Sequence, residues 1–191
     1  IKALLKDLDN ELKYLQNRKI HSIFIGGGTP SLMSVSDILE LFDGLKKRLS
    51  LTKSIEITLE VNPGTFEVEK FAQFREAGIN RLSIGVQSFN NDQLKFLGRI
   101  HNGEEATRAI SEAKKVGFDN INIDLMYGLK SQTIELCMED LMNAINLSPS
   151  HISFYQLTLE PNTLFSKFPP KLPLEEKIWE MGEKGAALLI E

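Results

Sequence analysis

The sequence predicts an α/β protein whose parallel sheet is bent into a barrel with an open lumen. Five short, β-branched runs recur about every 25–40 residues with a helical pattern between them, which is typical of successive βαβ units. Within the runs at 54–60, 81–87 and 119–125, apolar and polar residues alternate. Helices cover the apolar face of such a sheet, so the polar side chains are expected on the opposite face.

The polar face decides between three architectures. A doubly wound sheet would bury these polar side chains under a second layer of helices, at a large cost in free energy. A one-sided antiparallel sheet would leave them in water, but the helices between the strands argue against it. The lumen of a barrel accommodates them, and we therefore expect a barrel.

The elements follow in a regular order. Leucines at helical spacing predict an amphipathic helix over 1–17, and Ile20 to Ile25 predicts a buried strand. Ser36 is expected to cap the next helix, with Asp37 in its first turn. The later strands are expected at 54–60, 81–87, 119–125 and 151–159, and the later helices at 67–77, 92–97, 104–116, 133–146 and from 174 onward. No linker interrupts the pattern, so residues 1–191 are expected to form one domain, in which 174–191 could begin a C-terminal region.

Composition and charge exclude several classes of protein. The formal net charge of −4 gives no electrostatic footprint for nucleic acid. No apolar run reaches the length of a membrane span, and no signal-peptide pattern opens the chain. The single cysteine, Cys137, excludes internal disulfides and multi-cysteine metal sites, and we expect a cytoplasmic protein. Because residue 1 is Ile rather than Met, we interpret the chain as a fragment.

A glycine triplet directly follows the first strand. The P-loop pattern fails, because Thr29, Pro30 and Ser31 stand where a Lys-Ser/Thr pair is required. The dinucleotide fingerprint also fails, because Ser31 replaces its third glycine and Glu60 is too distant to be its acid. Two interpretations of the glycine triplet remain open: its backbone could bind a small anionic or zwitterionic ligand, or it could form a tight turn with no ligand.

Polar residues stand at the expected carboxyl ends of all five strands, where barrels bind ligands. They are Gly26–Thr29, Glu60, Gln87, Asp124 and the segment 156–158, with Arg99 in the loop after the third strand. The glycine backbone and Glu60 suit an ammonium group, and Arg99 suits a carboxylate. Gln87 and Asp124 offer acceptors for a ribose diol. An amino acid joined to a nucleoside, as in S-adenosylmethionine, fits this set.

Five motifs carry a family resemblance: GGGTPS (26–31), LEVNP (59–63), RLSIGVQSF (81–89), LGRIH (97–101) and IDLMYGL (123–129). Together they resemble the radical S-adenosylmethionine family of oxygen-independent coproporphyrinogen III oxidases. The run YQLTLEPNT (155–163) is closer to the heme chaperone (HemW-type) branch than to the oxidases. The resemblance implies a partial (β/α)6 TIM-like barrel whose first strand is missing from this chain.

The resemblance also implies residue roles. Gly27, Gly28, Thr29 and Glu60 would meet the methionyl amino group, and Arg99 its carboxylate. Gln87 and Asp124 would hold the ribose, and the backbone near Leu157 would lie beside the adenine.

The same family carries a 4Fe–4S cluster on a CxxxCxxC motif that would lie upstream of Ile1, and this chain lacks it. We expect Cys137 to be a core residue, since one thiolate cannot hold such a cluster. The chain alone is therefore expected to have no radical chemistry, no catalytic residue and no metal ligand.

Function is left with three alternatives. The first is a heme chaperone that passes heme to an acceptor protein. The second is a coproporphyrinogen III dehydrogenase, and the third is a non-catalytic α/β domain that binds a nucleoside. His101 could line the site, whereas His21 and His151 are expected to be structural. Phe154 and Tyr155 could line a tetrapyrrole pocket or belong to the core.

Overall fold

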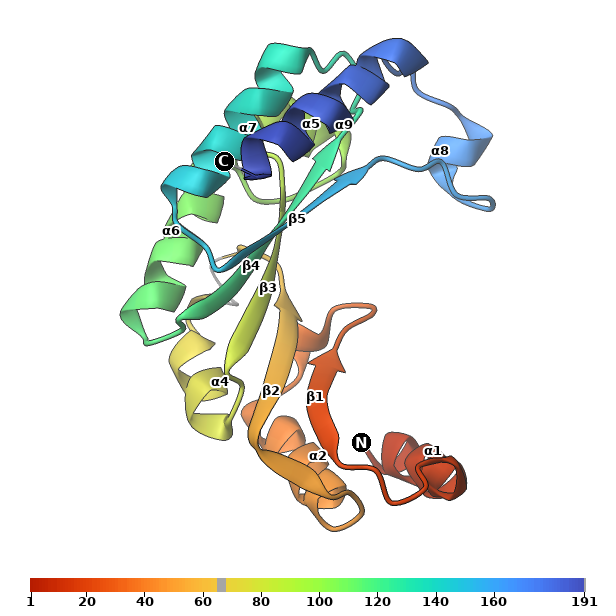
Figure 1. Ribbon diagram of the computed structural model, residues 1–191, viewed down its shortest axis with the longest axis vertical. Coiled ribbons are helices and arrows are strands. Elements are labelled where there is room, and N and C mark those ends of the chain that lie inside the picture. Colours follow the sequence, from red (N-terminus) through yellow and green to blue (C-terminus); the bar gives the residue numbers. More distant parts are fainter. Residues whose placement is uncertain (65–67, 191) are drawn as a thin grey trace.

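A computed structural model describes residues 1–64 and 68–190 as a curled sheet of five parallel strands with helices along its convex side (Figure 1). The strands lie in the order β1–β2–β3–β4–β5, and every neighbouring pair is parallel. Their bounds are β1 Ile20–Ile25, β2 Leu51–Val61, β3 Arg81–Gln87, β4 Asn120–Tyr127 and β5 His151–Gln156. The predicted α/β half-barrel is confirmed.

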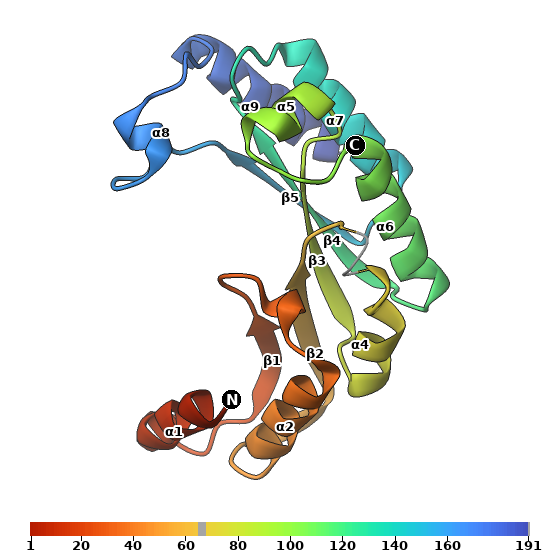
Figure 2. The same ribbon diagram turned by 180° about the vertical axis from the view of Figure 1, so that it is seen from behind.

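The helices that lie between successive strands return the chain to the same end of the sheet. The α-helices are α1 Lys2–Glu11, α2 Val35–Lys46, α4 Phe71–Ala77, α5 Asn91–Phe96, α6 Gly103–Lys115, α7 Ile134–Asn146, α8 Leu164–Lys167 and α9 Glu175–Ile190. Short 3₁₀ helices, η1 Leu12–Tyr14 and η2 Pro30–Leu32, follow α1 and β1. Seen from behind, α2, α4, α6 and α7 follow the outside of the curve, and none of the described helices lies across the concave side (Figure 2).

The core lies between the strands and the outer helices. Leu59, Leu82, Ile84 and Ile123 are fully buried on the apolar face of the sheet. Alternate residues of the same strands point to the concave side, where Asn122 Nδ2 donates to Ser83 Oγ at 2.8 Å. The predicted division into an apolar outer face and a polar inner face is therefore present, and it places polar side chains inside the curve.

Several expected element bounds differ from the structure. Ser34, not Ser36, caps α2, because its hydroxyl accepts from Asp37 N while Asp37 accepts from Ser34 N. The first α-helix ends at Glu11 rather than continuing to residue 17. The helix expected over 67–77 begins at Phe71 as α4, and residue 67 lies outside the described residues. The fifth strand ends at Gln156 rather than at residue 159.

Within the described residues, no helix combines the length and the apolar character that crossing a membrane requires.

Candidate functional site

A cavity of about 220 Å³ lies at the carboxyl ends of the strands, on the concave side of the sheet. Its lining comes from every strand or from the loop that follows it. The predicted residues among its lining are Gly28, Thr29, Glu60, Gln87, Arg99 and Asp124. Residues as far apart in sequence as Gly28 and Tyr155 thus share one cavity.

The glycine turn after β1 is tied directly to the end of β2. Gly27 N donates to Glu60 Oε2 at 3.0 Å. Gly27 and Gly28 both have positive φ, at 79° and 59°, a conformation that side chains disfavour. A Cβ on Gly26 would lie 2.9 Å from Cδ and Oε2 of Glu60, so only glycine lets this carboxylate approach the turn. Glu60 keeps its second oxygen, Oε1, without a hydrogen bond among the described residues.

Arg99 enters the cavity from the loop between α5 and α6. Its Nη1 donates to Asn62 Oδ1 at 3.4 Å, a long hydrogen bond that leaves most of the guanidinium donors available. Arg99 therefore offers a half-buried positive charge on the same cavity as the Glu60 carboxylate. A cation and an anion on one small cavity are what a zwitterionic ligand requires.

Asp124 is held by a layer of polar side chains on β3 and β4. Its Oδ1 accepts from Asn122 Nδ2 at 2.7 Å, and its Oδ2 accepts from Ser83 Oγ at 3.1 Å. Burial raises the pKa of Asp124, and the two hydrogen bonds oppose that rise by favouring the carboxylate. Each oxygen still has a lone pair for a ligand hydroxyl, and the partners fix where the oxygens point.

Gln87 is positioned by an irregularity in β3. Ile84 pairs with Ile123, but Gln87 pairs with Leu125, so β3 carries one extra residue between these pairs. Gln87 itself has a φ of 70°, in the left-handed region that non-glycine residues rarely adopt. Its side chain, 4% exposed, accepts a hydrogen bond at Oε1 from Tyr155 Oη at 2.6 Å.

Three residues that were predicted at the site, Gly27, Leu157 and His101, are not part of the cavity lining. Leu157 is buried beyond the end of β5, where its N donates to Tyr127 O at 2.9 Å, and it is not part of the cavity lining. His101 is also buried, with Nε2 3.1 Å from Val86 O, and it does not line the cavity. His21 and His151 stand at the amino ends of β1 and β5, the opposite edge of the sheet from the cavity.

Cys137 lies inside α7, and 1% of its surface is exposed. Burial raises the pKa of its thiol to about 12, so it carries no thiolate near neutral pH. Across residues 1–64 and 68–190, no group of three or more His, Cys, Asp or Glu side chains could hold a metal ion. The described residues therefore do not fit a 4Fe–4S cluster.

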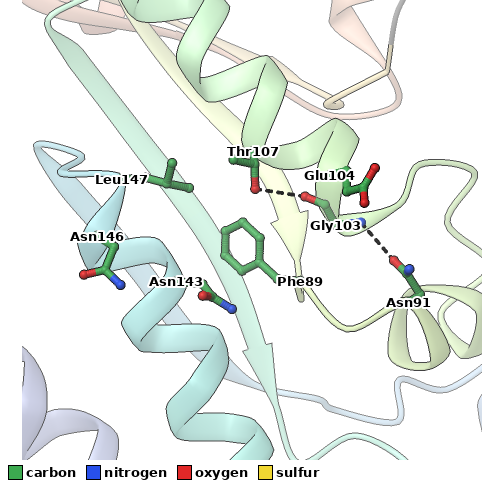
Figure 3. A pocket seen from close by; sticks show the side chains of 8 residues that line it. All are labelled: Phe89, Asn91, Gly103, Glu104, Thr107, Asn143, Asn146 and Leu147. Carbon is green, nitrogen blue, oxygen red and sulfur yellow. Dashed lines mark hydrogen bonds between the residues drawn. The ribbon is translucent and has the colours of Figure 1, made fainter.

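A second cavity, of about 400 Å³, opens on the convex side between α6 and α7 (Figure 3). It is lined by Phe89, Asn91, Gly103, Glu104, Thr107, Asn143, Asn146 and Leu147. Polar groups of this cavity hydrogen-bond to the first residue of α6, Gly103. Thr107 Oγ1 donates to Gly103 O, and Gly103 N donates to Asn91 Oδ1, both at 3.0 Å. No predicted site residue lines it, and it brings no opposite charges together, so the concave cavity is the candidate site.

The concave cavity also has lining residues that were not predicted as site residues, and Asn62 and Tyr155 are the two whose side chains hydrogen-bond to predicted ones. Asn62 entered the sequence analysis only as part of the motif LEVNP, and Tyr155 only as either a core or a tetrapyrrole-facing residue. Both line the cavity, Asn62 against Arg99 and Tyr155 against Gln87. A signal for Tyr155 was present in the sequence, because Ser153 and Tyr155 alternate with the apolar Ile152 and Phe154. The structure then pairs Ser153 with Asp124 of β4, which places that face of β5 on the cavity side.

Comparison with known proteins gives the same family that the motifs resemble. The chain is 50% identical over 189 residues to the heme chaperone HemW of Escherichia coli (strain K12), covering 99% of this chain and 50% of that protein. It is 53% identical over 190 residues to HemW of Haemophilus influenzae, covering 97% of this chain and 50% of that protein. The chain thus spans about half the length of these curated relatives.

Among solved structures, the coproporphyrinogen III oxidase HemN of Escherichia coli, described as a radical SAM enzyme, superposes with a TM-score of 0.85 at 28% identity. The match covers 99% of this chain and 44% of HemN. Residues 3–143 match the family described as the Radical SAM superfamily, which implies S-adenosylmethionine and a 4Fe–4S cluster as cofactors. Because the match covers well over half of this chain, the chain belongs to the radical SAM superfamily.

Proposed function

We propose that this half-barrel binds S-adenosylmethionine and that the intact protein is a heme chaperone in heme trafficking. The observation that carries the first part is the shared cavity, which joins the glycine turn, two carboxylates, an amide and a guanidinium. The similarity to heme chaperones at 50% and 53% identity supports the second part.

Each end of S-adenosylmethionine has a complementary group in the cavity. The methionyl ammonium is assigned to Glu60 and to the backbone of Gly27, Gly28 and Thr29, where Glu60 Oε1 is available as an acceptor. The methionyl carboxylate is assigned to Arg99, whose guanidinium makes one long hydrogen bond within the described residues.

The nucleoside is assigned to the other half of the cavity. Gln87 and Asp124 take the ribose, and the backbone at Leu157, just beyond the end of β5, lies beside the adenine in this proposal. Leu157 itself lies outside the cavity lining, so this contact with the adenine would be made by backbone beyond the cavity.

The cluster belongs to the intact protein in this proposal. Residues 1–64 and 68–190 offer no metal-binding group, and the relatives are about twice as long as this chain. The radical chemistry of the family is therefore not assigned to any residue described here. A cytoplasmic location, as expected from the composition, remains part of the proposal.

A coproporphyrinogen dehydrogenase is the second candidate, and the superposition on HemN favours it. The chain is only 28% identical to HemN, against 50% to the Escherichia coli heme chaperone. Since none of the three histidines lines the cavity, no heme ligand is assigned within this chain.

Two measurements test the proposal. Calorimetry of the anaerobically reconstituted intact protein with S-adenosylmethionine should show saturable binding, and absence of binding would leave a non-catalytic domain with a different ligand. The same protein should bind heme tightly, seen as a Soret band shift, and should not decarboxylate coproporphyrinogen III. Decarboxylation would favour the dehydrogenase instead.

A further inference from the structure

We propose that Tyr155 is a positioning residue that orients the amide of Gln87, so that Nε2 faces the ligand as a hydrogen-bond donor. The acceptor that this donor would meet is a hydroxyl oxygen of the ribose. The inference rests on the proposed function, because it concerns the same cavity, and it goes further by assigning a direction to one hydrogen bond.

The contact between Tyr155 and Gln87 fixes which end of the amide faces the phenol. Tyr155 Oη donates to Gln87 Oε1 at 2.6 Å, a short distance for a hydroxyl donor. Burial, together with the nearby Asp124 carboxylate, raises the pKa of Tyr155, so the phenol retains the proton that it donates. With Oε1 bound to Tyr155, the other end of the amide is Nε2, which can only donate.

The absence of a side chain at Gly85 gives Nε2 its place. Gly85 and Gln87 both line the cavity, and a Cβ on Gly85 would lie 3.0 Å from Gln87 Nε2. Nε2 therefore lies directly over the Gly85 backbone. Across residues 1–64 and 68–190, Nε2 donates no hydrogen bond, so its donors remain for a ligand.

The backbone of β3 supports the same arrangement. The extra residue before Gln87 and its φ of 70° occur at the end of β3, where the Gln87 side chain remains on the same face of the strand as Ser83 and Gly85. A left-handed backbone at a non-glycine residue costs free energy, and such positions concentrate at functional sites. The hydrogen bond from Tyr155 on β5 reaches across β4 and holds the Gln87 side chain in place.

Asp124 completes the recognition. Its carboxylate accepts from ligand hydroxyls, whereas Gln87 donates, so the two side chains differ in polarity at the same cavity. A vicinal diol matches this pair, because one hydroxyl can donate to Asp124 while the oxygen of the other accepts from Gln87. The sequence alone had suggested that both residues act as acceptors.

The test compares Tyr155→Phe with wild type in the intact, anaerobically reconstituted protein. The probes are S-adenosylmethionine and its 2′-deoxy and 3′-deoxy analogues, and the readout is the dissociation constant. We expect Tyr155→Phe to weaken binding of S-adenosylmethionine about three- to tenfold. We also expect it to shrink the penalty for removing one of the two hydroxyls, because the Gln87 amide is then free to turn.

Tyr127→Phe is the matched control. It removes the same hydroxyl from the neighbouring strand, and its ring stacks on Phe154 with centroids 4.4 Å apart, outside the cavity lining. This control should bind as wild type does. In a Gln87→Ala background, Tyr155→Phe should have no further effect, since it acts only through the amide.

The outcomes separate the two proposals. If wild type binds S-adenosylmethionine and Tyr155→Phe binds it with the same dissociation constant, this inference is overturned and the proposed function is not. So does a weaker constant with unchanged deoxy penalties, because that pattern reflects lost packing and not amide orientation. No binding of S-adenosylmethionine by wild type overturns the proposed function and this inference together.

Discussion

Glu60 Oε2 accepts a hydrogen bond from the backbone N–H of Gly27 at 3.0 Å, which links the end of β2 to the turn after β1. The contact depends on Gly26, where a side chain would overlap the carboxylate. Gly26 therefore determines whether the Glu60 carboxylate can lie beside the turn after β1.

Gly26→Ala should displace the Glu60 carboxylate. The new Cβ would lie 2.9 Å from Glu60 Oε2 and from Phe24 Cε1, closer than carbon contacts allow. We expect the intact protein to bind S-adenosylmethionine about three- to tenfold more weakly, as for one lost hydrogen bond, measured by calorimetry. Gly117→Ala is the control: its φ of 91° strains an alanine, but nothing lies within 4 Å of the added Cβ. That variant should lose stability and keep its affinity.

Arg99→Ala should cost about 1.5–3 kcal/mol of binding free energy, the usual worth of a charge-assisted hydrogen bond. Arg99→Lys should recover only part of the loss, because an ammonium cannot bind a carboxylate in two places. Calorimetry with S-adenosylmethionine gives both values. Arg108→Ala, on the exposed surface of α6, provides the comparison. Equal affinities in all four proteins would remove Arg99 from the site.

Asp140 makes folding stability depend on pH. Its carboxylate accepts from Ser88 Oγ and Phe89 N, each at 2.7 Å, but burial raises its pKa to about 6. The folded state thus holds the proton more tightly than the unfolded state does. The resulting stabilisation is fully present below the unfolded pKa of about 3.9 and is lost as pH rises through about 6.

Asp140→Asn should remove this dependence. Between pH 4 and pH 7, the free energy of unfolding of wild type should fall relative to the variant, by on the order of 3 kcal/mol. Urea denaturation at a series of pH values measures the difference. Asp119→Asn, which changes an exposed carboxylate, should follow the wild-type profile. A constant difference between wild type and Asp140→Asn would show that Asp140 does not titrate in this range.

Phe71→Ala should destabilise the fold by about 3–5 kcal/mol, because the ring is fully buried and meets Phe118 edge-on at 6.4 Å. Phe168→Ala removes an equal ring that is 66% exposed and should change stability by less than about 0.5 kcal/mol. Urea denaturation distinguishes the two. Similar losses in both variants would mean that the ring of Phe71 is not part of the core.

The sheet and most of the cavity were predictable, because both follow from local patterns. Alternation in 81–87 gave the face of each side chain, and parallel strands end at a common edge. These two rules placed Glu60, Gln87 and Asp124 together before any coordinates. The N-cap of α2 was also predictable, because Ser34 and Asp37 have the spacing of a capping box. The prediction of Ser36 as the cap did not take that spacing into account.

The contact of Tyr155 with Gln87 could not be predicted from the sequence. It depends on one extra residue in β3, which alters register without changing the apolar–polar pattern that the sequence displays. The end of β5 was missed for a related reason. Leu157 and Leu159 alternate with polar residues and so resemble a continued strand, but their alternation has the opposite phase to that of Ile152 and Phe154. The ladder with β4 stops at the pair of Tyr127 and Gln156.

The cavity takes its walls from both outer strands of the five that the structure describes, Thr29 after β1 and Tyr155 on β5. A molecule that touches both would therefore bridge the two margins of the curled sheet, which are not hydrogen-bonded to each other in the order β1–β2–β3–β4–β5.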